Sequence, residues 1–397
     1  MVLKIKDFLK KHTSLFILGI ASVSFFILNI LLKDVLSVSE YGLYSILITY
    51  SALISSFGLC GLDQVFLRTS IIEENRIVVD PRLVSMLCIT VLCMSLITST
   101  VISKYYDFEI SHFSLILLSI ALILIKLSYN VSRILSKFVL SQITLNLWKF
   151  TLPFIVVLSL YMGIEVNFSL IIKDLLYCCL FSLASFFLFY SNIKFKILEY
   201  SQLDLMKLAF SFFLVLFISS FINFSDRFII ERKFGLEELG NYFFFVNLYL
   251  YPFVFFSTYI GFRELVSFKK SFSIELLHQK LISAFKLSIL FSISYIILIT
   301  IIQKFGLYEF EIYRYKYLII LLIAWGIVKV LASLLSSTVS AVFDRKDLNK
   351  LNIYSIIIIL LASPFLYFSS SAINIVMIFI LVWIMRSSIY YKILLKR

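Results

Sequence analysis

Long apolar runs separated by short polar segments fill almost the entire chain. Most runs are about 20 residues long, the length that a helix needs to cross a hydrocarbon core of ~30 Å. They do not alternate polar and apolar residues, as the strands of a membrane β-barrel would. The pattern therefore predicts twelve membrane-crossing helices: 14–32, 43–62, 83–103, 112–132, 140–162, 169–191, 206–224, 241–262, 281–302, 317–340, 352–368 and 371–389.

The basic residues are distributed unevenly between the loops on the two sides of these spans. Most of the 36 Lys and Arg residues lie on one side if the N-terminus is cytoplasmic. Because cytoplasmic loops carry the excess of Lys and Arg, we expect both termini to be cytoplasmic. This asymmetry, together with anionic membrane lipids, accounts for the net charge of +13 without a nucleic-acid partner.

A short motif occurs once in each half of the chain, within residues 32–44 and 230–242. The matching residues keep one constant spacing: Glu40, Gly42 and Tyr44 in the first copy, and Glu238, Gly240 and Tyr242 in the second. Each copy follows one apolar run and opens the next. Duplicated bundles of helices are typical of membrane transporters. The repeat predicts two six-helix bundles, at 1–198 and 199–397.

The polar segments carry no sign of catalytic, metal or cofactor chemistry. The five Cys residues lie in or beside apolar runs and the three His residues are scattered. We therefore expect no disulfide framework, metal site or cofactor. The sequence contains no P-loop, Gly-x-Ser-x-Gly or His-Glu-x-x-His motif. The outer loops are predicted to be short, the longest at 225–240, and none could form a soluble domain of ~50 residues.

Two segments resemble a known family. In the first half, Glu40 to Tyr44 is followed by a helix that ends in Phe57-Gly58-Leu59, and then by Arg68. In the second half, Ser225-Asp226-Arg227 precedes 238–242. The pattern resembles the polysaccharide transporter family, the Wzx-type O-antigen and capsule flippases of the multidrug/oligosaccharidyl-lipid/polysaccharide (MOP) exporter superfamily.

The resemblance implies an all-α integral membrane protein with two pseudo-symmetric bundles around a central cavity, similar to MATE and other MOP exporters. It implies a non-enzymatic flippase that moves undecaprenyl-pyrophosphate-linked oligosaccharide across the bacterial inner membrane, coupled to a proton or sodium gradient. Membrane lipids are expected partners, and a polysaccharide polymerase and a chain-length regulator are further candidates. A headgroup of pyrophosphate and sugars needs a wet cationic path, because unpaired polar groups are costly in hydrocarbon.

Three lysines inside predicted spans are candidates for contacts with that headgroup. An intramembrane Lys costs ~2.5–3.5 kcal/mol and usually faces a cavity. Lys126 and Lys329 both end an Ile-Ala-x-x-x-[Ile/Val]-Lys string, one in each half, which predicts equivalent positions on one pyrophosphate site. Lys149 precedes Pro153, a residue that loosens helices. The alternative is that these lysines reach the interface with their charged ends.

Four further charges are candidates with open alternatives. Arg68 either contacts the substrate or anchors the cytoplasmic side. Asp63 could bind a proton or cation, cap a helix or pair with Arg68. Asp226 and Arg227 are either a gate or charges at the level of the lipid headgroups, at the outer end of the seventh span.

Two other functions are compatible with a chain of this size. An O-antigen polymerase-type membrane glycosyltransferase would carry a large outer loop, which the short predicted loops disfavour. A drug or small-solute exporter of the same superfamily would need an apolar site with one carboxylate rather than several cations.

Overall fold

The computed structural model is helical almost throughout. It describes residues 2–73, 76–135, 137–188, 193–197, 201–306, 308, 310–343 and 345–395. The ends of two predictions, 189–191 of the sixth span and the charges at 396–397, lie outside these residues. The chain divides into two compact units, Met1–Arg227 and Phe228–Arg397. These units are defined by packing, whereas the bundles at 1–198 and 199–397 were predicted from the repeated motif. The division into those two bundles stays a prediction.

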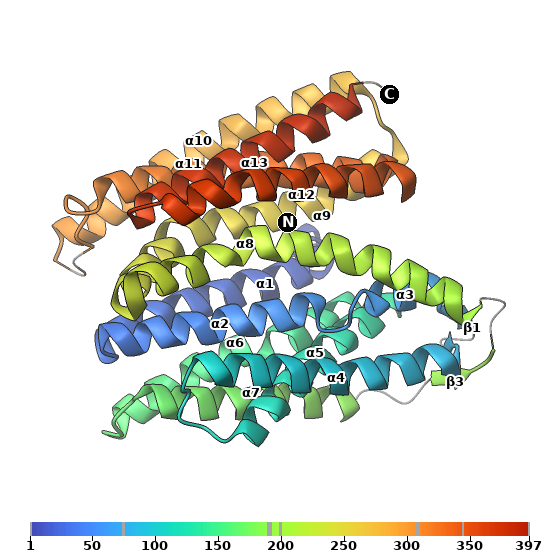
Figure 1. The fold of residues 1–397 in the computed structure, drawn as a ribbon, viewed down its shortest axis with the longest axis horizontal. Helices are drawn as coiled ribbons and strands as arrows, with labels where there is room; N and C mark the ends of the chain where they lie inside the picture. Colours follow the sequence, from blue (N-terminus) through green and yellow to red (C-terminus); the bar gives the residue numbers. More distant parts are fainter. Residues whose placement is uncertain are drawn as a thin grey trace. The chain divides into compact units, whose positions relative to one another are not determined.

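Among the described residues, the first unit holds seven helices and the beginning of an eighth, which Figure 1 labels α1 to α8. In chain order they are α1 (Val2–Val35), α2 (Val38–Phe57), α3 (Leu62–Thr69), α4 (Pro81–Tyr105), α5 (His112–Ile134), α6 (Phe138–Tyr161), α7 (Phe168–Leu188) and α8 (Gln202–Phe245), the last of which continues into the second unit. Helix α5 packs against α2, α4, α6 and α7, and α1 packs against α6.

In the part of the chain that the structure describes, the second unit holds the end of α8 and six further helices. They are η1 (Val246–Leu250), a π-helical turn, α9 (Tyr251–Lys270), α10 (Ile274–Lys304), α11 (Lys316–Val342), α12 (Arg345–Phe368) and α13 (Ala372–Leu394). Helix α11 packs against α9, α10 and α13. A Cβ atom on Gly326 of α11 would lie only 2.4 Å from Phe253 Cγ of α9, so glycine allows this close approach.

Helix starts are set by the side chains that cap them. At α2, Ser37 Oγ accepts a hydrogen bond from Glu40 N, and the Glu40 carboxylate accepts one from Ser37 N, which together form a capping box. The first copy of the repeated motif thus marks a helix start. The second copy follows Gly235, whose φ of 88° and ψ of 176° interrupt α8. In both copies the motif follows a break in the helix.

The number of membrane-crossing helices differs from the prediction in one place. In the part of the chain that the structure describes, eleven helices are long and apolar enough to cross a membrane. Two predicted spans, 206–224 and 241–262, fall in the single run Gln202–Gly261. A straight helix of that length would measure ~90 Å, about three times the hydrocarbon core. The break at Gly235 divides the run, and so the prediction of two spans there is compatible with the structure.

One prediction about the loops is wrong. Residues 225–240 are not a loop, because α8 continues through them apart from the break at Gly235. The connections between helices also contain a feature that was not predicted from the sequence. Strands β1 (Ile71–Glu73), β2 (Arg76–Val79) and β3 (Ile193–Phe195) form one small sheet in the order β1-β2-β3. Three- and four-residue strands leave too short a pattern to separate from loop sequence.

A lysine joins α8 to the end of α12 within the second unit. Lys233 Nζ donates to the carbonyl oxygens of Leu366, Tyr367 and Ser369 at 3.0, 2.6 and 2.6 Å, and to Ser369 Oγ at 3.1 Å. The last carbonyls of a helix have no partner within the helix. Lys233 therefore caps the C-terminus of α12 and also places a positive charge at the negative end of its dipole.

Candidate functional site

A buried carboxylate lies at the start of α3 in the first unit. The Asp63 side chain is 2% exposed. Its Oδ2 accepts hydrogen bonds from Asn130 Nδ2 of α5 at 3.2 Å and from Gln64 Nε2 at 3.0 Å. Its Oδ1 is buried with no hydrogen-bond partner among the described residues. An unsatisfied buried carboxylate oxygen is costly, and such a position suits a proton or a cation.

Lys126 lies near this carboxylate. It is one turn before Asn130 on α5, so the two share a helix face. Lys126 is close enough to Asp63 for their charges to attract each other, and its Nζ lies 5.1 Å from the centroid of the Tyr129 ring. The structure therefore brings two sequence-predicted candidates, Asp63 and Lys126, into one cluster. Asn130 was not a candidate, because its role depends on the packing of α3 against α5.

The turn before α3 fixes the position of Asp63. Cys60 and Gly61 both have positive φ, 48° and 78°. A Cβ atom on Gly61 would lie 2.3 Å from Ala209 O and 2.7 Å from Phe213 N, both in the backbone of α8. Only glycine allows this combination of left-handed backbone and close approach. Cys60 and Gly61, which follow the Phe-Gly-Leu segment, are thus the elbow before α3 that packs against the first part of α8.

The other candidates of the first unit lie elsewhere. Lys149 Nζ donates to Asn146 Oδ1 at 3.1 Å, and Asn146 Nδ2 donates to Gln142 Oε1 at 3.1 Å, which makes a polar row along α6. The Arg68 guanidinium stacks on the Phe212 ring at 4.5 Å. No ion pair between Arg68 and Asp63 occurs in the described structure, so that alternative is not supported.

Asp226 and Arg227 are buried, at 2% and 3% exposure, within α8. Arg227 Nη1 donates to Thr49 Oγ1 of α2 at 2.5 Å, and its guanidinium lies 5.5 Å from the Phe224 ring. Neither side chain is a solvated charge among lipid headgroups. Their role as a gate stays a proposal.

The second unit holds a cluster of two cations and three aromatic rings between α11 and α13. Lys329 Nζ lies 4.6 Å from the ring of Trp325 and 5.8 Å from that of Trp383. The Arg386 guanidinium lies 5.3 Å from the centroid of the same Trp383 ring, and its Nε donates to Tyr390 Oη at 3.0 Å. Lys329 and Arg386 are both buried. This cluster is called the Trp383 cluster below.

Sequence reasoning identified Lys329 but missed Arg386. The signal was the spacing of Trp383, Arg386 and Tyr390, which lie three and four residues apart and therefore share one face of a helix. Arg386 was not among the predicted candidates, although it lies within the predicted span 371–389. A buried guanidinium on an aromatic face is instead a position that can attract an anion.

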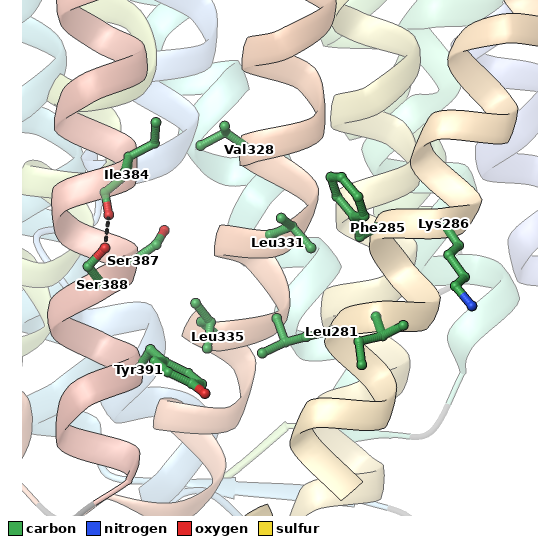
Figure 2. A pocket seen from close by; sticks show the side chains of 11 residues that line it. Leu281, Phe285, Lys286, Val328, Leu331, Leu335, Ile384, Ser387, Ser388 and Tyr391 are labelled. Carbon is green, nitrogen blue, oxygen red and sulfur yellow. Dashed lines mark hydrogen bonds between the residues drawn. The ribbon is translucent and has the colours of Figure 1, made fainter. Parts of the chain in front are cut away.

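A separate apolar groove of about 570 Å³ opens between α10, α11 and α13 (Figure 2). Leu281 and Phe285 of α10, Leu331 of α11 and Ile384 of α13 contribute to its apolar lining. Figure 2 shows Lys286 pointing away from the groove. Lys329 does not line it, and the neighbouring residue Val328 does. The groove and the Trp383 cluster are therefore distinct features of the same helices.

The predicted pyrophosphate site requires Lys126 and Lys329 together, and these residues belong to different units. That shared site stays a proposal. No group of three or more His, Cys, Asp or Glu that could hold a metal ion occurs among the described residues.

The fold is that of the MOP superfamily exporters. The solved structure of lipid II flippase MurJ in an inward closed conformation matches with a TM-score of 0.63 and 15% identity, over 96% of this chain and 87% of that one. An outward-facing multidrug resistance MATE family transporter matches with a TM-score of 0.54 and 12% identity, over 96% and 94%. A MATE structure in complex with Br-NRF gives 0.55 and 11%, over 96% and 93%.

The sequence identifies the family within this fold. The family model for polysaccharide biosynthesis proteins matches residues 31–268, more than half of the chain. The chain belongs to this family of polysaccharide transporters. A comparison with curated proteins found no match. The sequence prediction of the family and of a multi-span, MOP-type helical membrane protein is confirmed.

Proposed function

We propose that this protein is a flippase that moves undecaprenyl-pyrophosphate-linked O-antigen or capsule repeat units across the bacterial inner membrane. The observation that carries the proposal is the burial of basic side chains, Lys329 and Arg386 above all, within apolar membrane-crossing helices. Such positions are expensive in a bilayer and are kept where a polar or charged group passes. Membership of the polysaccharide family and the MurJ-like fold support a lipid-linked glycan as that group.

The roles of individual residues, the orientation in the membrane and the partners are proposed on the basis of the same flippase function. Lys126, Lys149, Lys329 and Arg68 are proposed to contact the pyrophosphate and the sugars, and Asp226 with Arg227 to form a gate. Both termini are proposed to be cytoplasmic, because the Lys and Arg residues are concentrated on that side. The protein is proposed to act without catalysis or a cofactor, next to a polysaccharide polymerase and a chain-length regulator.

One observation favours a second candidate function. The apolar groove between α10 and α13 has a volume within the range of small-molecule sites, ~300–1,000 Å³. It would suit the apolar solutes of a drug exporter of the same superfamily.

The test of the proposed function is complementation. A bacterial strain that lacks its own repeat-unit flippase, and that makes the glycan whose synthesis genes accompany this one, is given the natural chain. We expect surface polysaccharide to return, as measured by glycan gels and antibody labelling of cells. If polysaccharide stays absent while the protein is abundant in the membrane and drug resistance of the cells rises, the exporter is the correct function.

Asp63 is proposed as the coupling residue. Replacement of Asp63 by Asn keeps the shape and the possible bond to Asn130 but removes the charge. We expect the natural chain in proteoliposomes to flip lipid-linked oligosaccharide several-fold faster under a proton or sodium gradient, and the variant to show equal rates with and without it. The exposed Asp107→Asn is the matched control and should keep the stimulation. A gradient response that persists in Asp63→Asn would remove Asp63 from this role.

A further inference from the structure

The small sheet joins two distant connections of the first unit. Strands β1 and β2 form the connection between α3 and α4, and β3 lies in the connection between α7 and α8. Strand β1 pairs antiparallel with β2, and β3 pairs parallel with β2. Figure 1 shows β1 and β3 at one end of the helices of this unit. Since β2 is the central strand, β3 lies at an edge of the sheet.

The edge strand has an apolar side and a basic side. Ile193, Phe195 and Ile197 are 41%, 62% and 71% exposed. Lys194 and Lys196 alternate with them, and Lys196 N continues the pairing through a hydrogen bond to Val79 O at 3.0 Å. Because successive side chains of a strand point to opposite faces, Ile193 and Phe195 share one face of β3. The bond of Lys196 N extends this alternation toward Ile197. The two lysines lie on the other face, where Lys196 Nζ is also 3.8 Å from Glu73 Oε1 of β1 and both side chains of this pair stay exposed. Three large apolar side chains exposed on one edge are costly in water.

The connections of the sheet limit how far it can lie from the membrane. Strand β2 ends at Val79, two residues before Pro81 begins the membrane-crossing helix α4. At ~3.3 Å per residue, Val79 lies within about 7 Å of that helix. Each headgroup layer of a bilayer is about 5–8 Å thick. The sheet therefore belongs to the membrane–water interface and not to the aqueous phase beyond it.

We propose that strand β3 and Ile197 form an interfacial lipid anchor. Ile193, Phe195 and Ile197 insert at the boundary between headgroups and acyl chains, and Lys194 and Lys196 bind anionic lipid phosphates. The occupant is argued from charge complementarity and from continuity with the membrane-crossing helices. Amphipathic segments with basic and apolar faces bind this boundary in the same way. The anchor does not depend on the transported substrate.

Tryptophan substitution tests the apolar face. Phe195→Trp and Lys196→Trp are compared in reconstituted full-length protein, with the fluorescence of the natural chain subtracted. We expect lipids brominated near the headgroup end of the acyl chain to quench Trp at 195 and not at 196. Acrylamide in the aqueous phase should give the reverse order. Circular dichroism and elution volume verify that both variants fold.

Ile197→Trp tests whether every second side chain lies on the lipid-facing side of the strand. It should behave as Phe195→Trp does. Strong acrylamide quenching at both 195 and 197, without quenching by brominated lipid, would overturn the anchor, because that face would then meet water.

Lipid charge is tested with the double variant Lys194→Gln, Lys196→Gln. We expect phosphatidylglycerol to raise the thermal midpoint of the natural chain relative to phosphatidylcholine, and this rise to be smaller in the variant. The control is Lys104→Gln, Lys392→Gln, which removes the same charge from exposed positions on other helix ends. An equal rise in the variant and in the natural chain would overturn the lysine contacts.

Discussion

Replacing Lys329 by Ala is expected to reduce the transport of lipid-linked oligosaccharide about tenfold or more. Lys329 is 8% exposed and lies against Trp325 and Trp383, so its charge is held in a poorly hydrated place. Contacts between charged groups contribute ~1.5–3 kcal/mol each, and 1.36 kcal/mol corresponds to a factor of ten. Lys329→Arg keeps the charge and should impair transport less. Complementation of surface polysaccharide, corrected for protein in the membrane fraction, measures the effect.

A loss of packing could also lower display, because a lysine between two indole rings contributes to stability. The thermal midpoint of each purified variant separates the two causes. Lys304→Ala, at the exposed end of α10, is the control and should leave display unchanged. Full display from the double variant Lys126→Ala, Lys329→Ala at normal abundance would show that the proposed pyrophosphate site is wrong and would leave the family assignment intact.

The second large effect concerns the elbow before α3. Gly61→Ala is expected to destabilise the first unit by about 2–5 kcal/mol. A left-handed residue other than glycine costs ~1–2 kcal/mol, and overpacking adds ~1–3 kcal/mol. The clash is with the backbone of α8, 2.3 Å from Ala209 O, so no side-chain rotation relieves it. We expect a lower thermal midpoint in detergent and less protein in the membrane.

Gly163→Ala is a matched control for this substitution. Gly163 also has a positive φ, 70°, but a Cβ atom there would meet nothing within 4 Å. It should show only the backbone cost. If Gly61→Ala and Gly163→Ala lower the midpoint equally, the close approach of the elbow to α8 does not contribute to stability.

The sequence predicted the helices well because their signal is long. A run of about 20 apolar residues is a strong pattern, since few other structures tolerate it. The break at Gly235 depends on one residue, and the strands of the sheet depend on three or four, so neither stands out from the residues around it. Their formation depends on partners that lie far away in the chain, as Val79 and Phe195 do.

The candidate site was predicted only in part for a related reason. Lys126 and Lys329 were found because a charge within an apolar run is costly wherever the helix packs. The partners of Asp63 and the pairing of Arg386 with Trp383 depend on which faces of the helices meet. A single sequence does not contain that information directly. Arg386 could have been predicted from the sequence, because its aromatic neighbours Trp383 and Tyr390 are on its own helix.

The cap that Lys233 provides for α12 has a consequence for motion. Lys233 lies two residues before Gly235, the one described position within α8 with non-helical backbone angles. An ammonium group held by Leu366, Tyr367 and Ser369 links the segment 228–234 firmly to the end of α12. A rotation about Gly235 must therefore carry α12 together with that segment as one rigid body. If the backbone rotates at Gly235, the residues after it in α8 move relative to 228–234 and α12 together.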